Sequence, residues 1–520
     1  MSSLSNFAET LIICLVSWIL WRVFRRLVMT SPLDNIPGPP SNSFWTGNLR
    51  QILHRHQGWG FNNKLAEEYG SVVRFHGLLN TPILYAFDPK ALHSILLKDQ
   101  NLWEEPPWLI ATNLLLFGPG LLGTLGNWHR RQRKMLNPVF SINHMRFMTP
   151  IFYRITHSLR DAIYNQIEDG PRDVDLLDWM TRTALELVGQ GGLGYSFDPL
   201  VDESPNEFRA AIKSLVPALF ALAPFRTTLH YLKAMGPASF RRRVVDILPI
   251  PSLKRLKTIA EVLESQSREI FHAKKAALAQ GEDAVVRQVG EGKDIMSILL
   301  RENIAARPED RLPEEELLGQ MNTLVFAAMD TTSNALSHIL YLLAHHQDVQ
   351  NKARQELVDI SDGRDLTYDQ LVDLPYLDAI CRETLRVYPP VTNMTRTARE
   401  DAVLPLSTPF RGVNGKLIHS VPVPKGTDVY IAIRASNRNK ALWGSDAAEW
   451  KPERWLSPLP DAVPEAHIPG VYSNLMTFGG GGRSCIGFKF SQLEMIQPIQ
   501  KRYRVELGEY QVPHDRAQLE

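Results

Sequence analysis

Apolar residues recur with the period of an amphipathic helix over much of the chain. Residues 140–280 contain long stretches of this kind, such as Leu253–Leu278, with few runs of β-branched residues. Leu317–Ala344 is more continuously apolar and predicts a long buried helix. Leu377–Tyr388 predicts another helix, which ends at Pro389–Pro390 because proline blocks helix continuation. The pattern therefore predicts a mainly helical protein.

Segments with strand character are fewer and shorter. The clearest are Val72–Phe75, Ile83–Phe87 and Asp428–Ile433, which are rich in β-branched and aromatic residues. Glycine and charged residues gather in Gly281–Lys293, which predicts an exposed loop ahead of the long apolar helix. Strands are thus expected to form a small part of the fold.

The composition is that of a globular protein with a large core. Of the 520 residues, 44% are hydrophobic, and the formal net charge is +1, so there is no basic excess that would imply nucleic-acid binding. Length alone suggests about three domains, but no internal repeat or long low-complexity tract divides the chain. Only Cys14, Cys381 and Cys485 occur, which argues against a disulfide framework and favours a reducing compartment. We assign Cys381 to the core.

The segment Phe478–Gly487, F-G-G-G-G-R-S-C-I-G, places a cysteine in a glycine-rich loop just before a predicted helix. Backbone N–H groups of the loop and of the helix N-terminus stabilise a thiolate, and glycines let the backbone approach a flat macrocycle. A phosphate-binding turn or a flexible linker is the alternative, but the Lys-Ser/Thr that a phosphate-binding turn requires after the last glycine is missing. The pattern therefore predicts that Cys485 is a haem-iron ligand that favours O–O bond cleavage.

Every fixed position of this loop fits the pattern F-x-x-G-x-R-x-C-x-G, and the chain in this respect resembles the cytochrome P450 family. The resemblance runs from the proline-rich segment near residue 36 to the cysteine helix. It implies the cytochrome P450 fold, with one large helical catalytic domain and a small β-rich part over residues 42–520. It also implies that haem b is bound by Cys485, that Arg483 pairs with a haem propionate and that Phe478 covers the proximal face.

Two further segments match a structural motif of the family. E-x-x-R occurs at residues 383–386, about a hundred residues before the cysteine, and P-E-R-W at 452–455 resembles the family's P-E-R-F. Residues three apart share a helix face, so Glu383 and Arg386 can pair. The resemblance implies that Arg454 joins them in a buried triad whose role is structural.

The long apolar helix contains A-A-M-D-T-T at 327–332, where the family has A/G-G-x-D/E-T-T/S, and Ala328 replaces the usual glycine. Acidic and hydroxyl groups are costly to bury in an apolar helix without partners, so a water-filled groove explains them naturally. In the family this helix crosses the distal haem face and is locally widened. The resemblance implies that Thr331 hydrogen-bonds the reacting dioxygen and that Asp330 relays protons to it, rather than merely capping or kinking the helix.

A basic run, H-R-R-Q-R-K at 129–134, precedes L-N-P-V-F. The family shows W-x-x-x-R before a similar L-x-P-x-F, so Arg133 takes the arginine place and His129 the tryptophan place. The resemblance implies that both donate to haem propionates, which suits the fixed fork of arginine, and that Arg396, after the proline pair, adds another contact. We expect solvent or a reductase to face the other basic side chains, Arg130, Arg131 and Lys134.

Residues 1–30 predict a membrane anchor. Leu11–Trp21 is apolar and uncharged, and Phe7–Val28 extends it toward the roughly 20 residues of a span if charged groups lie at the interfaces. Arginines follow the apolar run and none precedes it, which predicts a single-pass anchor in the endoplasmic reticulum membrane with the catalytic domain in the cytosol. A helix lying in the interface is the alternative. A proline-rich hinge, residues 31–41, follows.

The resemblance also implies the reaction. Such enzymes take electrons from NADPH through a reductase and insert one oxygen atom of O2 into a C–H bond or a double bond. No flavin or nicotinamide domain fits in this chain, so a separate NADPH–cytochrome P450 reductase is required. Residues expected at the pocket or its entrance are mostly apolar, which favours a large hydrophobic substrate such as a terpenoid. They are Phe44, Trp45, Trp103, Trp108 and residues 114–117, 215–225 and 391–394. The basic run also resembles fungal members used in secondary metabolism.

Two other functions stay open. A haem-thiolate isomerase or dehydratase uses no O2, although it would not need a pair such as Asp330 and Thr331. A non-catalytic haem-binding copy is suggested by Ile496–Tyr503, which contains Pro498 and is short for the family's helix before the strand-like Arg504–Leu507. A proline inside a helix costs about 3 kcal/mol or more, so a truncated helix is expected after the cysteine.

Overall fold

The structure is a computed structural model that describes residues 31–170, 172–201, 206–223, 235–361 and 363–500, with isolated positions at 13, 17, 21, 229 and 231. Most of the predicted anchor, residues 1–30, and the predicted strand Arg504–Leu507 lie outside the described residues. Within the described ranges, none of the helices combines the length and the apolar character that crossing a bilayer requires.

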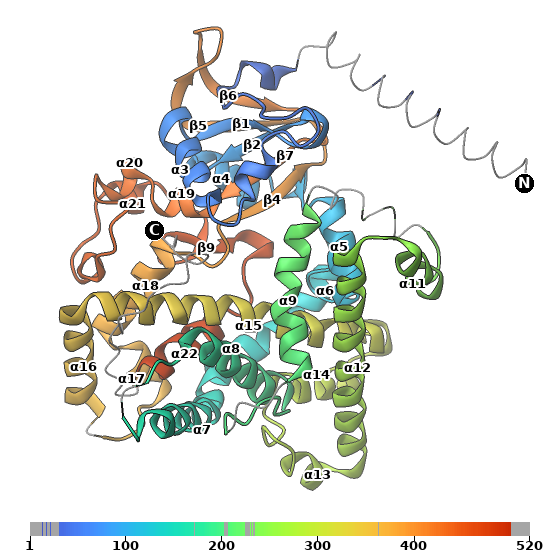
Figure 1. The fold of residues 1–520 in the computed structure, drawn as a ribbon, viewed down its shortest axis with the longest axis vertical. Coiled ribbons are helices and arrows are strands. Elements are labelled where there is room, and N and C mark those ends of the chain that lie inside the picture. The colour runs from blue at the N-terminus through green and yellow to red at the C-terminus, as the bar shows by residue number, and fades with distance from the viewer. Residues whose placement is uncertain are drawn as a thin grey trace, which may run out of the picture.

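Helices build the larger part of the molecule, with α15 running through its middle (Figure 1). Around it are packed, among others, α5, α8, α12, α18 and α22. The helices of this part are α5 (Pro107–Phe117), α6 (Gly126–Leu136), α7 (Ile142–Ile167), α8 (Leu176–Leu187), α9 (Glu207–Ala221), α11 (Ala238–Ile247), α12 (Pro251–Gln280), α13 (Glu282–Val286), α14 (Ile295–Ala305), α15 (Glu314–His345), α16 (Gln347–Ser361), α17 (Tyr368–Val372), α18 (Pro375–Val387) and α22 (Phe488–Gln500).

Local sequence signals set the ends of the predicted helices. α12 begins at Pro251, where the missing N–H costs nothing, and ends before Gly281, whose φ is +106°. α15 begins with three glutamates, which the positive end of the helix dipole favours. α18 ends at Val387, shortly before Pro389. The three predicted helices are thus confirmed, with one to three residues added at most ends.

The small β part lies at one end of the molecule (Figure 1). Its main sheet has the order β1-β2-β7-β4-β3, in which only the pair β2 and β7 is parallel. The strands are β1 (Val72–His76), β2 (Pro82–Ala86), β3 (Trp103–Glu104), β4 (Asn393–Ala398) and β7 (Asp428–Ala432), with the hairpins β5 (Ala402–Arg411) to β6 (Leu417–Val423) and β8 (Gly470–Tyr472) to β9 (Leu475–Gly480). The short helices beside them are α2 (Leu49–Ile52), α3 (Gly58–Tyr69), α4 (Pro89–His93), α19 (Ile433–Asn437), α20 (Lys440–Trp443) and α21 (Ala462–Glu465). The three predicted strands are confirmed as β1, β2 and β7.

Three local expectations differ from the structure. The predicted loop Gly281–Lys293 contains α13, because Val285 finds a buried position there. The proline-rich segment 31–41 is packed, since Leu33 and Ile36 are buried in the core of the β part. The helix after the cysteine is not cut short at Pro498, because α22 continues through it to Gln500.

Candidate active site

The cysteine loop connects strand β9 to helix α22. The backbone N–H of Cys485 donates to the carbonyl oxygen of Phe478 over 2.8 Å, which closes the loop at its two ends. Burial raises the pKa of the Cys485 thiol, while the Gly487 backbone N–H and the Arg133 guanidinium act in the opposite direction. The thiol lies deep within the protein, yet its residue is accessible to solvent. Cys485 therefore faces an internal space from the loop just before α22.

Glycine is required in this loop partly by the surrounding protein. Gly479 and Gly481 have φ values of +66° and +69°, which favour glycine. A Cβ on Gly480 would lie 2.0 Å from the Pro469 carbonyl oxygen, and one on Gly481 would lie 2.0 Å from that of Leu96. From the sequence, glycine is expected in this loop because the backbone approaches a flat macrocycle. At these two positions, neighbouring backbone already excludes a side chain.

Phe478 stands at the start of the loop among other aromatic rings. Its ring meets Tyr472 edge to face, with centroids 5.3 Å apart, and lies 6.1 Å from the ring of Phe488 in the first turn of α22. Such contacts orient an aromatic side chain more strictly than apolar burial alone. Phe478 is therefore held beside the loop that carries Cys485.

Helix α15 presents the predicted acid and alcohol to solvent. Ala327, Asp330 and Asn334 are exposed in the middle of this largely buried helix, and Thr331 is partly exposed. The Thr331 hydroxyl donates to the Ala327 carbonyl oxygen over 2.7 Å. Although its surface is accessible, Asp330 lies in the interior of the fold, and this partial desolvation raises the pKa of its carboxyl group. The carboxylate has no hydrogen bond or ion pair with another described residue. The local widening implied by the resemblance is not seen, because α15 is α-helical from Glu314 to His345.

A buried carboxyl group links α15 to the helix of the cysteine. Glu494 of α22 is fully buried, and one of its oxygens accepts a hydrogen bond of 2.8 Å from the Thr332 hydroxyl. Ser491, one turn earlier in α22, lies 3.3 Å from the same hydroxyl. Burial raises the pKa of Glu494 well above its ordinary value. Sequence reasoning missed this residue, although a glutamate among apolar residues after the cysteine was a usable signal.

The four predicted propionate ligands come from three distant segments and form one basic cluster. His129 and Arg133 lie on α6, Arg396 on β4, and Arg483 in the cysteine loop. Burial and the positive charges of these three arginines, together with Arg130, lower the pKa of His129 to about 3, so the imidazole is neutral. Neutral imidazole keeps one N–H to donate.

Within this cluster Arg133 is turned toward the cysteine loop. Its guanidinium donates to the Ser484 carbonyl oxygen over 2.6 Å and to the Ser484 hydroxyl over 3.1 Å. Arg483 donates to the carbonyl oxygens of Thr124 and Leu121 over 2.7 and 3.3 Å. Both side chains thus fasten the loop to the segment around α6.

Two acidic residues that sequence reasoning did not single out face the cluster. Glu105 lies 3.5 Å from the Arg483 guanidinium and 3.7 Å from that of Arg396, and Glu104 lies 3.8 Å from Arg483. They directly follow Trp103 in the sequence. Carboxylates at this position show that the cluster suits anionic oxygen ligands.

One basic side chain expected at the surface is paired instead. Arg131 donates to Glu316 over 2.9 Å, and the neighbouring Gln132 donates to the other oxygen of this buried carboxylate over 2.6 Å. A glutamate in the first turn of α15 would otherwise be buried without a partner. Arg130 and Lys134 are exposed, as expected.

The structure brings the E-x-x-R pair and the third arginine together. Arg386 and Glu383 are fully buried and joined by two hydrogen bonds of 2.8 Å. Arg454 approaches Glu383 at 3.5 Å, and the Trp455 indole N–H donates to Glu383 over 2.9 Å. The remaining donors of Arg386 reach the carbonyl oxygens of Asn437, Ala447 and Glu449. The Glu383 carboxylate is therefore satisfied by both arginines, the indole and the Lys451 backbone N–H.

This set of side chains fits a haem group. Cys485 is accessible to solvent although its thiol lies within the fold, and basic groups that can donate to carboxylates gather beside its loop. Helix α22 packs on α15, which carries the accessible Asp330 and Thr331. Haem needs one axial donor and cationic partners for two propionates. Cys485 would hold the iron, and the cluster would hold the propionates.

Comparison with known proteins agrees with this geometry. The family model described as "Cytochrome P450" matches residues 37–501. Cytochrome P450 monooxygenase 91 of Postia placenta is 56% identical over 93% of this chain and 89% of its own length. Ganoderic acid synthetase of Ganoderma lucidum is 48% identical over 92% of this chain and 88% of its own. A crystal structure of a cytochrome P450 shares the fold with a TM-score of 0.68 at 21% identity, covering 90% of this chain and 92% of that one. The chain therefore belongs to the cytochrome P450 family and is a cytochrome P450 monooxygenase with a haem-thiolate centre.

Proposed function

We propose that this monooxygenase inserts one oxygen atom of O2 into a large apolar substrate of the terpenoid class, with electrons from NADPH delivered by a separate reductase. The observation that carries the proposal is that Cys485, Asp330 and Thr331 are all accessible to solvent inside the fold, on segments that α22 and α15 hold together. Haem b, bound through Cys485, supplies the O–O cleavage that a thiolate ligand favours.

The residues of α15 manage protons in this reaction. Asp330 has a raised pKa and no partner among the described side chains, so it can take a proton from water and release it toward the reacting centre. The Thr331 hydroxyl donates its proton to a hydrogen bond with the helix backbone. Its oxygen lone pairs therefore remain able to accept a hydrogen bond from a group that carries the proton onward. An isomerase or dehydratase would need neither group, and therefore we place oxygen insertion first.

The basic cluster and Phe478 position the cofactor. We assign the haem propionates to the basic cluster of His129, Arg133, Arg396 and Arg483. Arg396 and Arg483 already pair with the carboxylates of Glu104 and Glu105, so each would either replace this partner by a propionate or bind both. Phe478, held by Tyr472 and Phe488, covers the thiolate side. The triad of Glu383, Arg386 and Arg454 keeps a structural role.

Substrate class rests on the apolar character of the expected lining and on one relative named for ganoderic acid. Among the predicted lining residues, Leu215 belongs to the helical core, whereas Phe44, Trp45 and Val391 are exposed.

We further propose that residues 1–30 anchor the enzyme to the endoplasmic reticulum membrane, with the catalytic domain facing the cytosol. Full-length protein should then sediment with membranes, and a variant lacking residues 1–30 should not.

The haem-thiolate assignment is tested by the reduced, CO-bound absorption spectrum of the purified protein. We expect the long-wavelength thiolate band in the wild type and its loss in Cys485→Ser. Turnover with reductase should require both NADPH and O2. Thr331→Ala should keep the thiolate band but divert electrons away from substrate oxidation. The amount of product formed per NADPH consumed should then fall about tenfold or more, in line with a general acid–base contribution. Turnover without NADPH or O2 would favour the isomerase, and a wild type without the band would favour the non-catalytic copy.

A further inference from the structure

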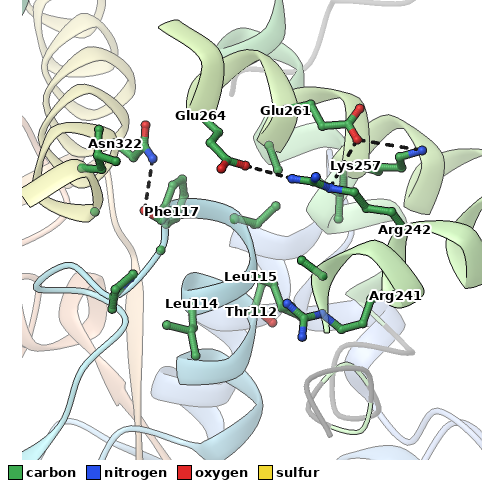
Figure 2. A pocket seen from close by; sticks show the side chains of 18 of the residues that line it. Thr112, Leu114, Leu115, Phe117, Arg241, Arg242, Lys257, Glu261, Glu264 and Asn322 are labelled. Atoms are coloured by element: carbon green, nitrogen blue, oxygen red, sulfur yellow. Dashed lines mark hydrogen bonds and ion pairs between the residues drawn. The ribbon is translucent and has the colours of Figure 1, made fainter. Parts of the chain in front are cut away.

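A second pocket lies away from the cysteine loop, between α5, α11, α12 and the first turns of α15 (Figure 2). Its volume is about 370 Å³, within the range of small-molecule sites. Apolar side chains from all four helices line it: Leu114, Leu115, Val245, Leu253, Leu256 and Leu318. The pocket is therefore suited to the apolar body of a small ligand.

This pocket is separated from the proposed site of oxidation. The residues of α15 that line it end at Asn322, nine residues before Thr331, which is about 14 Å along a helix. Between the two positions the ring of Phe117 stacks on Phe326 of α15, with centroids 4.6 Å apart. Asn322 also donates to the Phe117 carbonyl oxygen, which fixes the end of α5 against α15. Residues 114–117, which we expect at the substrate pocket or its entrance, line this pocket, and Phe117 forms its wall toward Phe326. A ligand in the pocket would thus lie on the far side of this aromatic pair from Thr331.

Most charged groups at the rim of the pocket neutralise one another. Arg242 pairs with Glu264 at 2.9 Å (Figure 2), and Arg268 pairs with the same carboxylate at 3.1 Å. Lys257 pairs with Asp246 at 2.6 Å. These basic side chains are committed to carboxylates of the protein, and a ligand anion would have to compete for them.

Arg241 differs from its neighbours. It extends from α11 into the pocket, with its guanidinium directed toward α5 (Figure 2). It donates to the Gly236 carbonyl oxygen but has no carboxylate within ion-pair distance in the described part of the chain. The adjoining sequence, residues 224–234, contains no Asp or Glu. Glu315 of the lining has no ion-pair partner among the described residues and is exposed in the first turn of α15, where the helix dipole favours it.

We propose that this pocket is a binding site for an apolar carboxylic acid, distinct from the oxidation site, with Arg241 as the partner of the ligand carboxylate. A guanidinium offers two parallel N–H donors that match a carboxylate, and the leucine-rich lining takes the hydrocarbon part. An apolar alcohol of the same length fills the same lining but leaves Arg241 without a charged partner.

The test is isothermal titration calorimetry of decanoate and decan-1-ol on the full-length, haem-loaded protein. Clotrimazole, a bulky azole that ligates haem iron, is kept at saturation so that the oxidation site is filled. Decanoate should still bind. Arg241→Gln should weaken decanoate binding about tenfold or more, the scale of a charge-assisted hydrogen bond, and leave decan-1-ol unchanged. Arg243→Gln, an exposed neighbour on α11 outside the lining, is the matched control and should change neither.

A second variant tests the pocket itself. Ala260 lines it from α12, and Ala260→Phe should weaken the acid and the alcohol alike by filling the space, while the haem spectrum stays that of the wild type. The proposal is overturned if clotrimazole abolishes decanoate binding, since the pocket would then belong to the oxidation site. It is equally overturned if the two arginine variants behave alike, or if the wild type binds no decanoate.

Discussion

Replacing Glu494 by glutamine tests whether the carboxyl group between α22 and α15 is neutral in the folded protein. Glu494 has no exposed surface, and it accepts a 2.8 Å hydrogen bond from Thr332. Burial raises its pKa well above the ordinary value. Glutamine has nearly the same shape and keeps an oxygen that accepts the bond from Thr332, so the substitution removes mainly the ability to ionise.

The sign of the effect follows from proton linkage. A carboxyl group whose pKa is raised by folding binds more protons in the folded state than in the unfolded chain. Its contribution to stability is fully present below the unfolded pKa of about 4.3 and is lost as pH rises toward the folded pKa. In this window the loss is about 1.4 kcal/mol per pH unit. The free energy of unfolding of Glu494→Gln should therefore match that of the wild type near pH 4 and exceed it increasingly above about pH 5.

Urea denaturation of the haem-loaded protein, followed by tryptophan fluorescence at several pH values between about 4 and 8, measures this difference. Glu465→Gln serves as the control, because Glu465 is exposed on α21. Its stability should follow the wild-type curve at every pH. A difference between Glu494→Gln and the wild type that stays constant with pH, or that shrinks as pH rises, would refute the neutral carboxyl group.

Two further substitutions test the structural parts of the site. Glu383→Ala leaves the fully buried Arg386 guanidinium without its carboxylate and should lower the free energy of unfolding by about 3 to 5 kcal/mol in urea denaturation, whereas Ala at the exposed Glu449 should change it little. Gly481→Ala combines a φ of +69° with a Cβ placed 2.0 Å from a backbone oxygen, so the haem content per purified chain should fall sharply. In Gly482→Ala the new Cβ meets only the tip of a side chain at 3.3 Å, so the haem content should fall less. Equal losses of haem in the two variants would contradict the steric argument.

Sequence alone was enough to locate the helices with strong periodicity and clear end signals, and the motifs whose residues are close together. α12, α15 and α18 lie close to their expected positions, because proline, glycine and first-turn acids act within a few residues. The cysteine loop and the E-x-x-R pair are of the same kind, since each brings its residues together through local backbone geometry alone.

What lay beyond the sequence depended on contacts between distant segments. The residues Glu104 and Glu105 face Arg396 and Arg483 only because β3 pairs with β4 and the cysteine loop folds back toward them. Likewise, Pro498 looked like a helix terminator by local rules, yet α22 continues past it because packing against α7 and α15 outweighs one lost hydrogen bond.

The buried partners of charged groups were decided by tertiary structure for the same reason. Arg131 reads as a solvated charge in its basic run, but α15 brings the buried Glu316 within 2.9 Å of it. The lack of a carboxylate partner for Arg241 in the described part of the chain becomes clear only when the ion pairs of α11 and α12 are known. Local sequence specifies backbone conformation over a few residues, whereas pairing and desolvation depend on which distant groups the fold brings together.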